Sequence, residues 1–143
     1  MRQKDQNVIP DFDGAKVAIL RRNQVLTLLR DDKPDIPWPN LWDLPGGGRD
    51  GDEDPIETAT RELQEELGIT LPEERIVFHQ EALNEAGKTI HFFLVLWDSL
   101  DPEIIRFGDE GQSWMFMDAL EFMDRHDVIP HHQKRLRLAL ASL

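Results

Sequence analysis

Residues 61–68 read Arg-Glu-Leu-Gln-Glu-Glu-Leu-Gly, and they constrain the fold and chemistry of this chain more than any other segment. On a helix, Glu62 neighbours both Glu65 and Glu66, so three carboxylates crowd one side while the leucines point inward. Like charges at this spacing destabilise an isolated helix by roughly 0.2–0.5 kcal/mol per pair, and the helix dipole disfavours negative charge in the C-terminal half. A divalent cation would reverse the sign of this interaction, and Mg²⁺ prefers hard oxygen ligands.

The residues before this segment favour a metal site. Residues 46–48 are glycines, so their backbone can approach a ligand closely and offer bare amides or carbonyls. Glu53 stands just ahead of the helix. The alternative is a solvated acidic face in which Arg61 pairs with Glu57 or Glu65. A glycine loop that leads into a carboxylate-lined helix predicts a cradle for a metal ion and a diphosphate.

Both ends of this helix are marked in the sequence. Asp54 suits the N-cap, Pro55 the first helical position and Glu57 the third, where it can complete a capping box. Gly68 is a natural C-terminal stop. Four apolar residues at helical spacing predict one buried stripe, which consists of Ile56, Ala59, Leu63 and Leu67.

The rest of the chain alternates between strand-like and helix-like patterns. Apolar, β-prone runs predict strands at residues 15–20, 24–29, 41–44, 75–83, 89–97 and 113–117, and the proline-rich residues 31–40 predict a loop. We expect a short helix at 118–125. A last helix after Pro130 is expected to bury one face, made by Leu136, Ala139, Leu140 and Leu143. Strands and helices that interleave around one sheet predict an α/β layered fold, and 143 residues suit one domain over residues 1–143.

Composition narrows the partners. The formal net charge of −12 argues against a nucleic-acid polymer or an anionic membrane, since both are polyanions. A small phosphorylated substrate remains compatible if divalent cations lie between the carboxylates and the phosphate oxygens. The absence of cysteine excludes thiolate metal sites. No apolar run approaches the roughly 18 residues of a membrane helix, and the polar first residues lack a signal-peptide core, so we expect a cytoplasmic protein. The oligomeric state stays open, with a homodimer as one option.

The order of residues 47–69 resembles a known family signature. Gly47, five residues, Glu53, seven residues and then Arg-Glu-Leu-Gln-Glu-Glu-Leu-Gly-Ile are similar to the Nudix box at every defined position. The lead-in Leu-Pro-Gly-Gly at 44–47 is also similar to that of the family. The resemblance implies a Nudix-type α/β/α sandwich around a mixed β-sheet. It also implies a metal-dependent enzyme, using Mg²⁺ or alternatively Mn²⁺, that hydrolyses a diphosphate linkage in a nucleoside diphosphate joined to another group.

The resemblance further implies roles for single residues. Glu65 and Glu66 would be the principal metal ligands, with Glu62 as a further ligand or the general base. Residues 108–114 are similar to a downstream region where several members place another metal-binding glutamate, so Glu110 would be a distant ligand or an alternative base. The choice between Glu62 and Glu110 stays open. The remaining implied roles are metal coordination by the Gly46 carbonyl, orientation of the glutamates by Arg61, and structural support from Gly47, Glu53 and Gly68.

The box does not define the substrate. Arg30 and Arg49 are candidate phosphate contacts, with surface salt bridges as the alternative. Trp38 lies in the proline-rich loop and is a candidate to stack on a nucleobase, whereas Trp42 lies in an apolar run and is expected in the core. Similarity to MutT-type enzymes suggests a nucleotide such as a (d)NTP. The chain has no tyrosine, which the diadenosine-polyphosphate hydrolases of this family typically carry beyond the box.

Residues 129–133 depart from the MutT pattern. MutT-type enzymes read an oxidised guanine with an asparagine near the last helix, but this chain has Ile-Pro-His-His-Gln there. This departure argues against 8-oxoguanine as the base of the substrate. We expect His131 and His132 at a solvated helix start rather than at a base pocket. Two other readings stay open: a catalytically idle Nudix-fold module that binds a nucleotide or a protein, and an acidic helix in an unrelated fold, which predicts no metal effect on stability.

Overall fold

A parallel pair of strands lies at the centre of the sheet. The computed structural model describes residues 9–143, and in it β1 (Gly14–Arg21) runs parallel to β6 (Thr89–Leu96). The seven-stranded sheet has the order β3-β2-β1-β6-β5, with β4 paired to β1 and β7 paired to β2. The other pairings are antiparallel, so the sheet is mixed. The remaining strands are β2 (Gln24–Leu29), β3 (Trp42–Asp43), β4 (Gly46–Gly48), β5 (Ile76–Leu83) and β7 (Ser113–Asp118).

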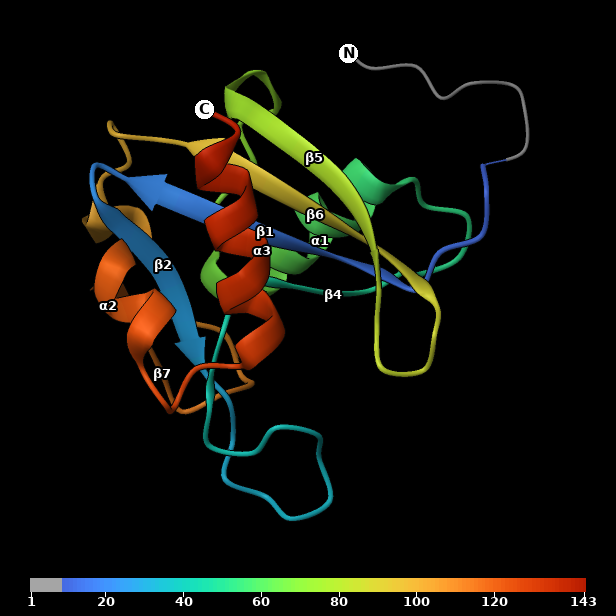
Figure 1. The fold of residues 1–143 in the computed structure, drawn as a ribbon, viewed down its shortest axis with the longest axis horizontal. Helices are drawn as coiled ribbons and strands as arrows, with labels where there is room; N and C mark the ends of the chain where they lie inside the picture. Colours follow the sequence, from blue (N-terminus) through green and yellow to red (C-terminus); the bar gives the residue numbers. More distant parts are fainter. Residues whose placement is uncertain (1–8) are drawn as a thin grey trace.

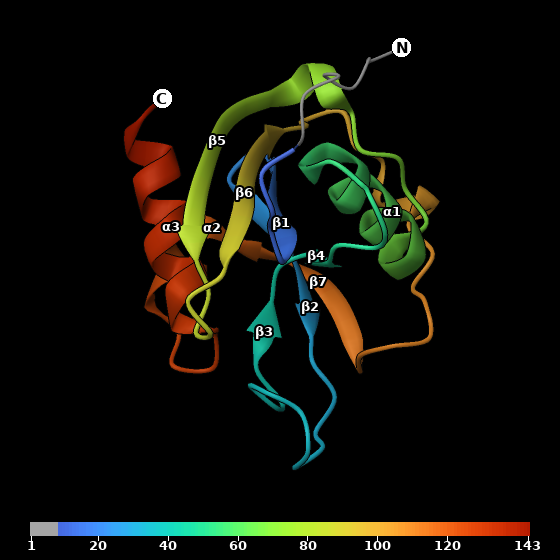
Figure 2. The same ribbon diagram turned by 90° about the vertical axis from the view of Figure 1, so that its right-hand side faces the viewer.

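Strand β1 changes its partner along its length. Its last residues pair with β2, where Leu20 lies opposite Val25, and its first residues pair with β4, where Ala15 lies opposite Gly47. β2 and β4 therefore share one edge of β1 and then diverge, as Figure 2 shows.

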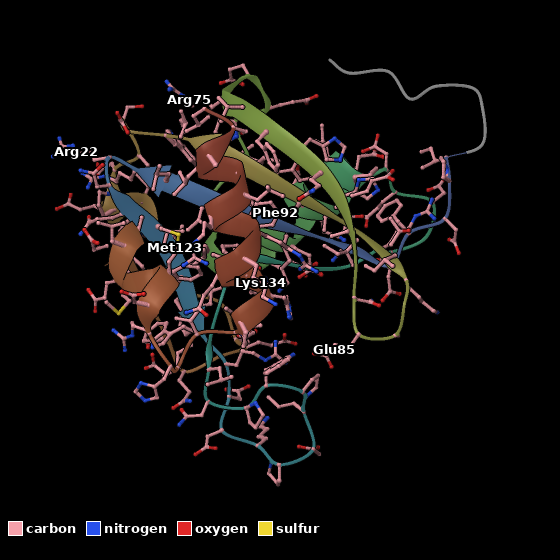
Figure 3. All side chains as sticks on the ribbon, viewed as in Figure 1. Arg22, Arg75, Glu85, Phe92, Met123 and Lys134 are labelled. Carbon is pink, nitrogen blue, oxygen red and sulfur yellow. The ribbon has the colours of Figure 1, made fainter. Side chains whose placement is uncertain are left out.

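Alternating side chains build a core on each face of the sheet, because successive residues of a strand point to opposite faces. Helix α1 (Pro55–Leu67) covers one face, and α2 (Ala119–Asp124) and α3 (Pro130–Ala141) cover the other (Figure 1, Figure 2). The first core contains Val17, Ile19, Leu63, Leu67 and Phe93. The second core contains Ala18, Phe92, Leu94, Phe122 and Leu136, and Phe92 is labelled in Figure 3. The expected α/β/α sandwich around a mixed sheet is confirmed.

The helix that the sequence marks most clearly forms as expected. Asp54 accepts a hydrogen bond from the Glu57 amide, and Glu57 accepts one from the Asp54 amide, which completes the capping box. Gly68 ends the helix in the left-handed conformation, at φ 67°. Ala59, Leu63 and Leu67 are fully buried. The same cap residues therefore fix the orientation of the three glutamates relative to the core.

Two expectations need correction. Leu143 was expected on the buried face of the last helix, but its side chain is 62% exposed because α3 ends at Ala141. Residues 46–48 were expected as a loop, but they form β4 because their backbone pairs with β1. In the described part of the chain, no helix is long and apolar enough to span a membrane.

Candidate active site

The three box glutamates leave the same helix but have different surroundings. Glu65 is exposed, whereas Glu62 and Glu66 are partly buried against β4. The Glu66 carboxylate accepts a hydrogen bond from the Gly46 amide at 2.8 Å. Burial raises the pKa of Glu66 to about 8, because Lys16 and the Gly46 amide offset only part of the desolvation. Glu66 is thus a partly buried carboxylate whose charge this protein leaves largely uncompensated.

Arg61 organises the other carboxylates. Its guanidinium donates to Glu53 at 2.8 Å, to Glu62 at 2.9 Å and to the Gly48 carbonyl at 2.7 Å. It also lies 3.4 Å from Glu65. The Arg61 hydrogen bond lowers the pKa of Glu53, which also accepts from Thr58. Arg61 and Glu53 therefore connect the helix to β4, and Arg61 contacts the carboxylates that it was expected to orient.

Close packing requires glycine at two positions of β4, Gly46 and Gly47. A Cβ atom on Gly47 would lie 2.6 Å from the Glu62 carboxyl carbon, and a Cβ atom on Gly46 would lie 2.1 Å from the Ala15 carbonyl oxygen. Gly46 also has φ 131°, a conformation that other residues rarely adopt. Only glycines let β1, β4 and the Glu62 side chain approach one another at these distances.

A distant loop brings further carboxylates to the helix. The Gly108 amide donates to the Glu66 carbonyl at 2.9 Å, and this contact anchors the loop at the C-terminal end of α1. One pocket of about 390 Å³ is lined by Glu62, Glu65, Glu66, Asp109 and Glu110. Glu110 thus lines the same pocket as the box glutamates, the neighbourhood that the family resemblance implied. Asp109 was missed, and its only signal was its position beside Glu110.

This donor set fits a hard divalent cation in chemistry, since it consists of carboxylate oxygens. Within residues 9–143, no three carboxylate or imidazole side chains are grouped closely enough to hold a metal ion. Arg61 holds Glu62, and Gly46 holds Glu66, so the oxygens would have to converge by side-chain rotation. The Gly46 carbonyl accepts from Lys16 Nζ at 3.3 Å, so Lys16 competes for this expected ligand.

A second hollow borders β4. This cavity of about 360 Å³ is bounded by β1, β4, the β5–β6 turn that carries Glu85 (Figure 3), the Trp38 loop and the start of α3. Trp38 and His131 meet edge to face, with ring centroids 5.8 Å apart. His132 is 1% exposed, so the expectation of a solvated helix start is wrong for this residue. His131 also lines the cavity, so both histidines face a pocket after all.

Asp43 is the central charge of this cavity, and sequence reasoning missed it. Its carboxylate is 3.1 Å from Lys16 Nζ, 3.1 Å from Arg30 Nη1 and 2.7 Å from His132 Nε2. Burial alone would raise the pKa of Asp43, but Lys16 and the His132 hydrogen bond outweigh it and hold the pKa well below its usual range. The residues that pair with Asp43 lie up to 89 positions away in sequence, so no local pattern marked it.

The remaining expected site residues divide between the hollows and the scaffold. Arg30 lines the cavity and a third hollow, and the latter also contains Asp43, Glu66 and Glu110. This third hollow therefore shares lining residues with both the cavity and the carboxylate pocket. Arg49 instead pairs with Asp11 at 3.3 Å and donates to the Glu53 carbonyl, which favours its salt-bridge alternative. Its guanidinium carbon also lies 4.5 Å from the centroid of the Phe12 ring. Trp42 is buried in the second core, as expected.

A comparison with known families decides the relationship. The family model described as NUDIX domain matches residues 12–140, which include both the box and the 108–110 loop. The chain belongs to the Nudix family. The match thus confirms the family that the resemblance of residues 44–69 indicated.

Related proteins differ in length from this Nudix chain. It is 46% identical over 117 residues to an RNA pyrophosphohydrolase of Acidiphilium cryptum (strain JF-5), a match that covers 76% of this chain and 58% of that protein. It is 40% identical over 73 residues to Nudix hydrolase 3 of Arabidopsis thaliana, covering 48% of this chain and 9% of that protein. The chain thus spans less than two thirds of the length of either relative.

Solved structures share the fold. A bifunctional NMN adenylyltransferase/ADP ribose pyrophosphatase from Francisella tularensis, complexed with AMP and a Mn ion, superposes with a TM-score of 0.74 at 21% identity, over 93% of this chain and 42% of that one. A MutT protein from Methanosarcina mazei Go1 superposes with a TM-score of 0.71 at 18% identity, over 92% of this chain and 94% of that one. At these identities the likeness concerns the Nudix fold alone.

Proposed function

We propose that this chain is a metal-dependent Nudix hydrolase that cleaves a diphosphate linkage in a nucleotide-type substrate. The observation that carries the proposal is the gathering of Glu62, Glu65, Glu66, Asp109 and Glu110 around one pocket. Arg61 offsets only part of the negative charge of these five carboxylates, so the pocket favours a bound cation. The idle-module alternative predicts loss of a box glutamate, and the chain retains all of them.

The chain's own residues suggest a division of labour. Glu65 and Glu66 would hold Mg²⁺ or Mn²⁺, which when bound supplies charge neutralisation on the phosphate oxygens. Glu62 or Glu110 would accept a proton from the attacking water, since both line the pocket. Arg61 would act as a positioning residue through its hydrogen bond to Glu62.

The lining residues that the hollows share support a substrate that spans them. Arg30 and Asp43 border the cavity, Glu66 and Glu110 border the carboxylate pocket, and the third hollow contains all four. A nucleotide could place its nucleoside in the cavity and its phosphates along Arg30. A (d)NTP fits this layout, and so does the 5′-terminal triphosphate nucleotide of an RNA, the substrate type suggested by the name of the Acidiphilium relative. The net charge of −12 favours the small nucleotide over the polymer.

The test is a hydrolysis panel with Mg²⁺ and with Mn²⁺. It should contain (d)NTPs, nucleotide sugars, dinucleoside polyphosphates and a short 5′-triphosphorylated RNA. We expect metal-dependent turnover that falls by at least about 10³-fold in Glu66→Gln and stays unchanged in Glu74→Gln, an exposed carboxylate outside the site. Turnover only on the RNA would replace the (d)NTP with the polymer end as substrate.

Two other results would change the assignment. No turnover on any compound, combined with no rise in Tm on adding metal, would favour an idle module. Turnover that survives Glu66→Gln would move the metal site away from this residue.

The general base is identified by a separate comparison of the pH–rate profiles of Glu62→Gln and Glu110→Gln. Loss of the base removes the acidic limb of the profile.

A further inference from the structure

Strand β5 forms a free edge of the sheet. It stands last in the order β3-β2-β1-β6-β5, and within residues 9–143 no strand pairs with its outer side. Native proteins usually protect such an edge with a short strand, proline or lysine, because its unpaired backbone groups can pair with another chain. β5 spans eight residues, Ile-Val-Phe-His-Gln-Glu-Ala-Leu, and contains neither proline nor lysine. A bulge between Ile76 and Phe78 interrupts only its start, so residues 78–83 form a regular strand.

The backbone groups of β5 point alternately to β6 and to the outer edge. The Asn84 amide donates to the Lys88 carbonyl at 2.8 Å, across the turn that joins the two strands. Residues of an antiparallel strand alternate between directing their N–H and C=O groups toward the partner strand and away from it. Since Asn84 directs its amide toward the β6 side, the even-numbered residues of the regular strand do the same. His79, Glu81 and Leu83 therefore direct their N–H and C=O groups to the outer edge.

The side chains of the odd-numbered residues form a pattern that complements its own reverse. Val77 is 46% exposed and Leu83 is 66% exposed, and His79 and Glu81 are exposed between them on the same face. The order along the strand is therefore apolar, imidazole, carboxylate, apolar. In an antiparallel pair of such strands, each apolar side chain lies opposite an apolar one, and each imidazole lies opposite a carboxylate. A two-fold interface between identical chains requires this self-complementarity.

We propose that β5 pairs antiparallel with β5 of a second copy of this chain, in the register that sets His79 opposite Glu81. This register places Gln80 on the two-fold axis and sets Val77 opposite Leu83. Like charges directly opposite each other destabilise a sheet, whereas complementary pairs stabilise it. A shift of two residues in one direction sets Glu81 opposite Glu81, and the same shift in the other direction sets it opposite Val77. Of these three registers, the proposed one alone gives the carboxylate a polar partner.

One strand from each copy makes a small interface, so we expect a weak dimer. Arg135 already donates to the Leu83 carbonyl at 3.1 Å, which leaves the backbone groups of His79 and Glu81 to make the central hydrogen bonds. Complexes that bury less than about 1,200 Å² are typically transient. Sedimentation velocity at about 0.15 M salt, which screens the repulsion between two chains of net charge −12, should show mostly monomer at about 1 μM and mostly dimer at about 200 μM. A chain that stays monomeric at the higher concentration would overturn the inference.

A charge reversal on the strand tests the pairing of His79 with Glu81. Glu81→Lys should raise the dissociation constant of the dimer at least about tenfold, because the two-fold axis makes each lost pair count twice. Glu74→Lys makes the same change of charge on an exposed residue outside the strand, so it should change the constant less than about twofold. Equal effects of the two variants would contradict the proposed interface.

A single cysteine tests the register. The natural chain has no cysteine, so an introduced one can cross-link only to its own copy. Gln80 would face Gln80 as a non-hydrogen-bonded pair, whose Cα atoms lie about 4.5 Å apart, within the range that a disulfide spans. Gln80→Cys should therefore form a covalent dimer on mild oxidation, seen by non-reducing electrophoresis. Ala82→Cys is the control, because its own copy would lie about 13 Å away along the strand.

Two results of the cross-linking would overturn the register. One is a Gln80→Cys chain that stays monomeric on oxidation, and the other is equal cross-linking of Gln80→Cys and Ala82→Cys. Circular dichroism checks that each variant is folded, and if Gln80→Cys is not, the comparison of Glu81→Lys with Glu74→Lys decides the matter. The strand contributes no residue to the carboxylate pocket, so the failure of the dimer and the failure of the proposed hydrolysis are separate results.

Discussion

Gly47→Ala tests whether β4 positions the Glu62 carboxylate. The added methyl group would lie 2.6 Å from the Glu62 carboxyl carbon and 2.7 Å from one of its oxygens. Ordinary contact begins at 3.4 Å, so the carboxylate must retreat by about 0.8 Å. The obstacle is the end of a flexible side chain rather than backbone, so the fold should tolerate the change. The structure therefore predicts a loss of activity that is larger than the loss of stability.

The magnitudes follow from this displacement. A shift of about 1 Å in a catalytic group can cost about 10²-fold in rate, so we expect kcat to fall roughly 10- to 100-fold. The unfolding free energy should change by less than about 1 kcal/mol, because replacing glycine in a strand gains some backbone entropy that offsets the displaced Glu62.

The assay pairs Gly47→Ala with a neighbouring control. Gly48→Ala places its methyl group 3.7 Å from the nearest atom, the Asp13 carbonyl oxygen, so both kcat and Tm should stay close to wild type. Turnover with Mg²⁺ and urea unfolding would be measured for both variants. Full activity in Gly47→Ala, or equal losses in the two variants, would refute the role of β4 in positioning Glu62.

Three further predictions concern charged groups. Arg61→Lys should lower kcat at least about tenfold with KM unchanged, because one ammonium cannot contact Glu53, Glu62 and the Gly48 carbonyl at the same time. Steady-state kinetics would measure both constants, and a wild-type kcat would contradict the prediction. Burial lowers the pKa of His131 to about 4. Between about pH 6.5 and 4, the His131 side chain is therefore protonated in the unfolded chain but not in the native protein, so the free energy of unfolding falls as the pH drops through this window. After allowance for solvent screening, wild type should lose about 1 kcal/mol more than His131→Gln between pH 7 and 4.5 in urea unfolding, and parallel curves would exclude this linkage. Burial raises the pKa of Glu66 to about 8, so protons compete with a metal ion for this carboxylate below that pH. Calorimetry should show the Mn²⁺ affinity rising by up to about tenfold from pH 7 to 8. A pH-independent affinity would contradict the assignment of Glu66 as a metal ligand.

The sequence by itself determined the elements whose signals are local. The capping residues around α1 and its apolar stripe depend on interactions within one or two helical turns, so Asp54, Glu57 and Gly68 act in the structure as the sequence predicts. Glu62, Glu65 and Glu66 share a pocket because helical spacing places them on one side. The expectation that Glu110 lies near these glutamates came from the family resemblance. In the structure, the hydrogen bond from the Gly108 amide to the Glu66 carbonyl holds the loop that carries Glu110 against α1.

The tertiary structure alone decided the cavity beside this site. Asp43 pairs with Lys16 across 27 positions and with His132 across 89 positions, and such pairing depends on how the strands and α3 pack. His132 follows a proline at a helix start, where a polar side chain usually meets solvent; packing of α3 against the sheet buries it instead. Gly47 likewise has no local requirement for glycine, and only the approach of Glu62 from another element imposes one. Local patterns describe free-energy preferences within a segment, whereas burial and charge pairing between distant segments are defined only when those segments meet.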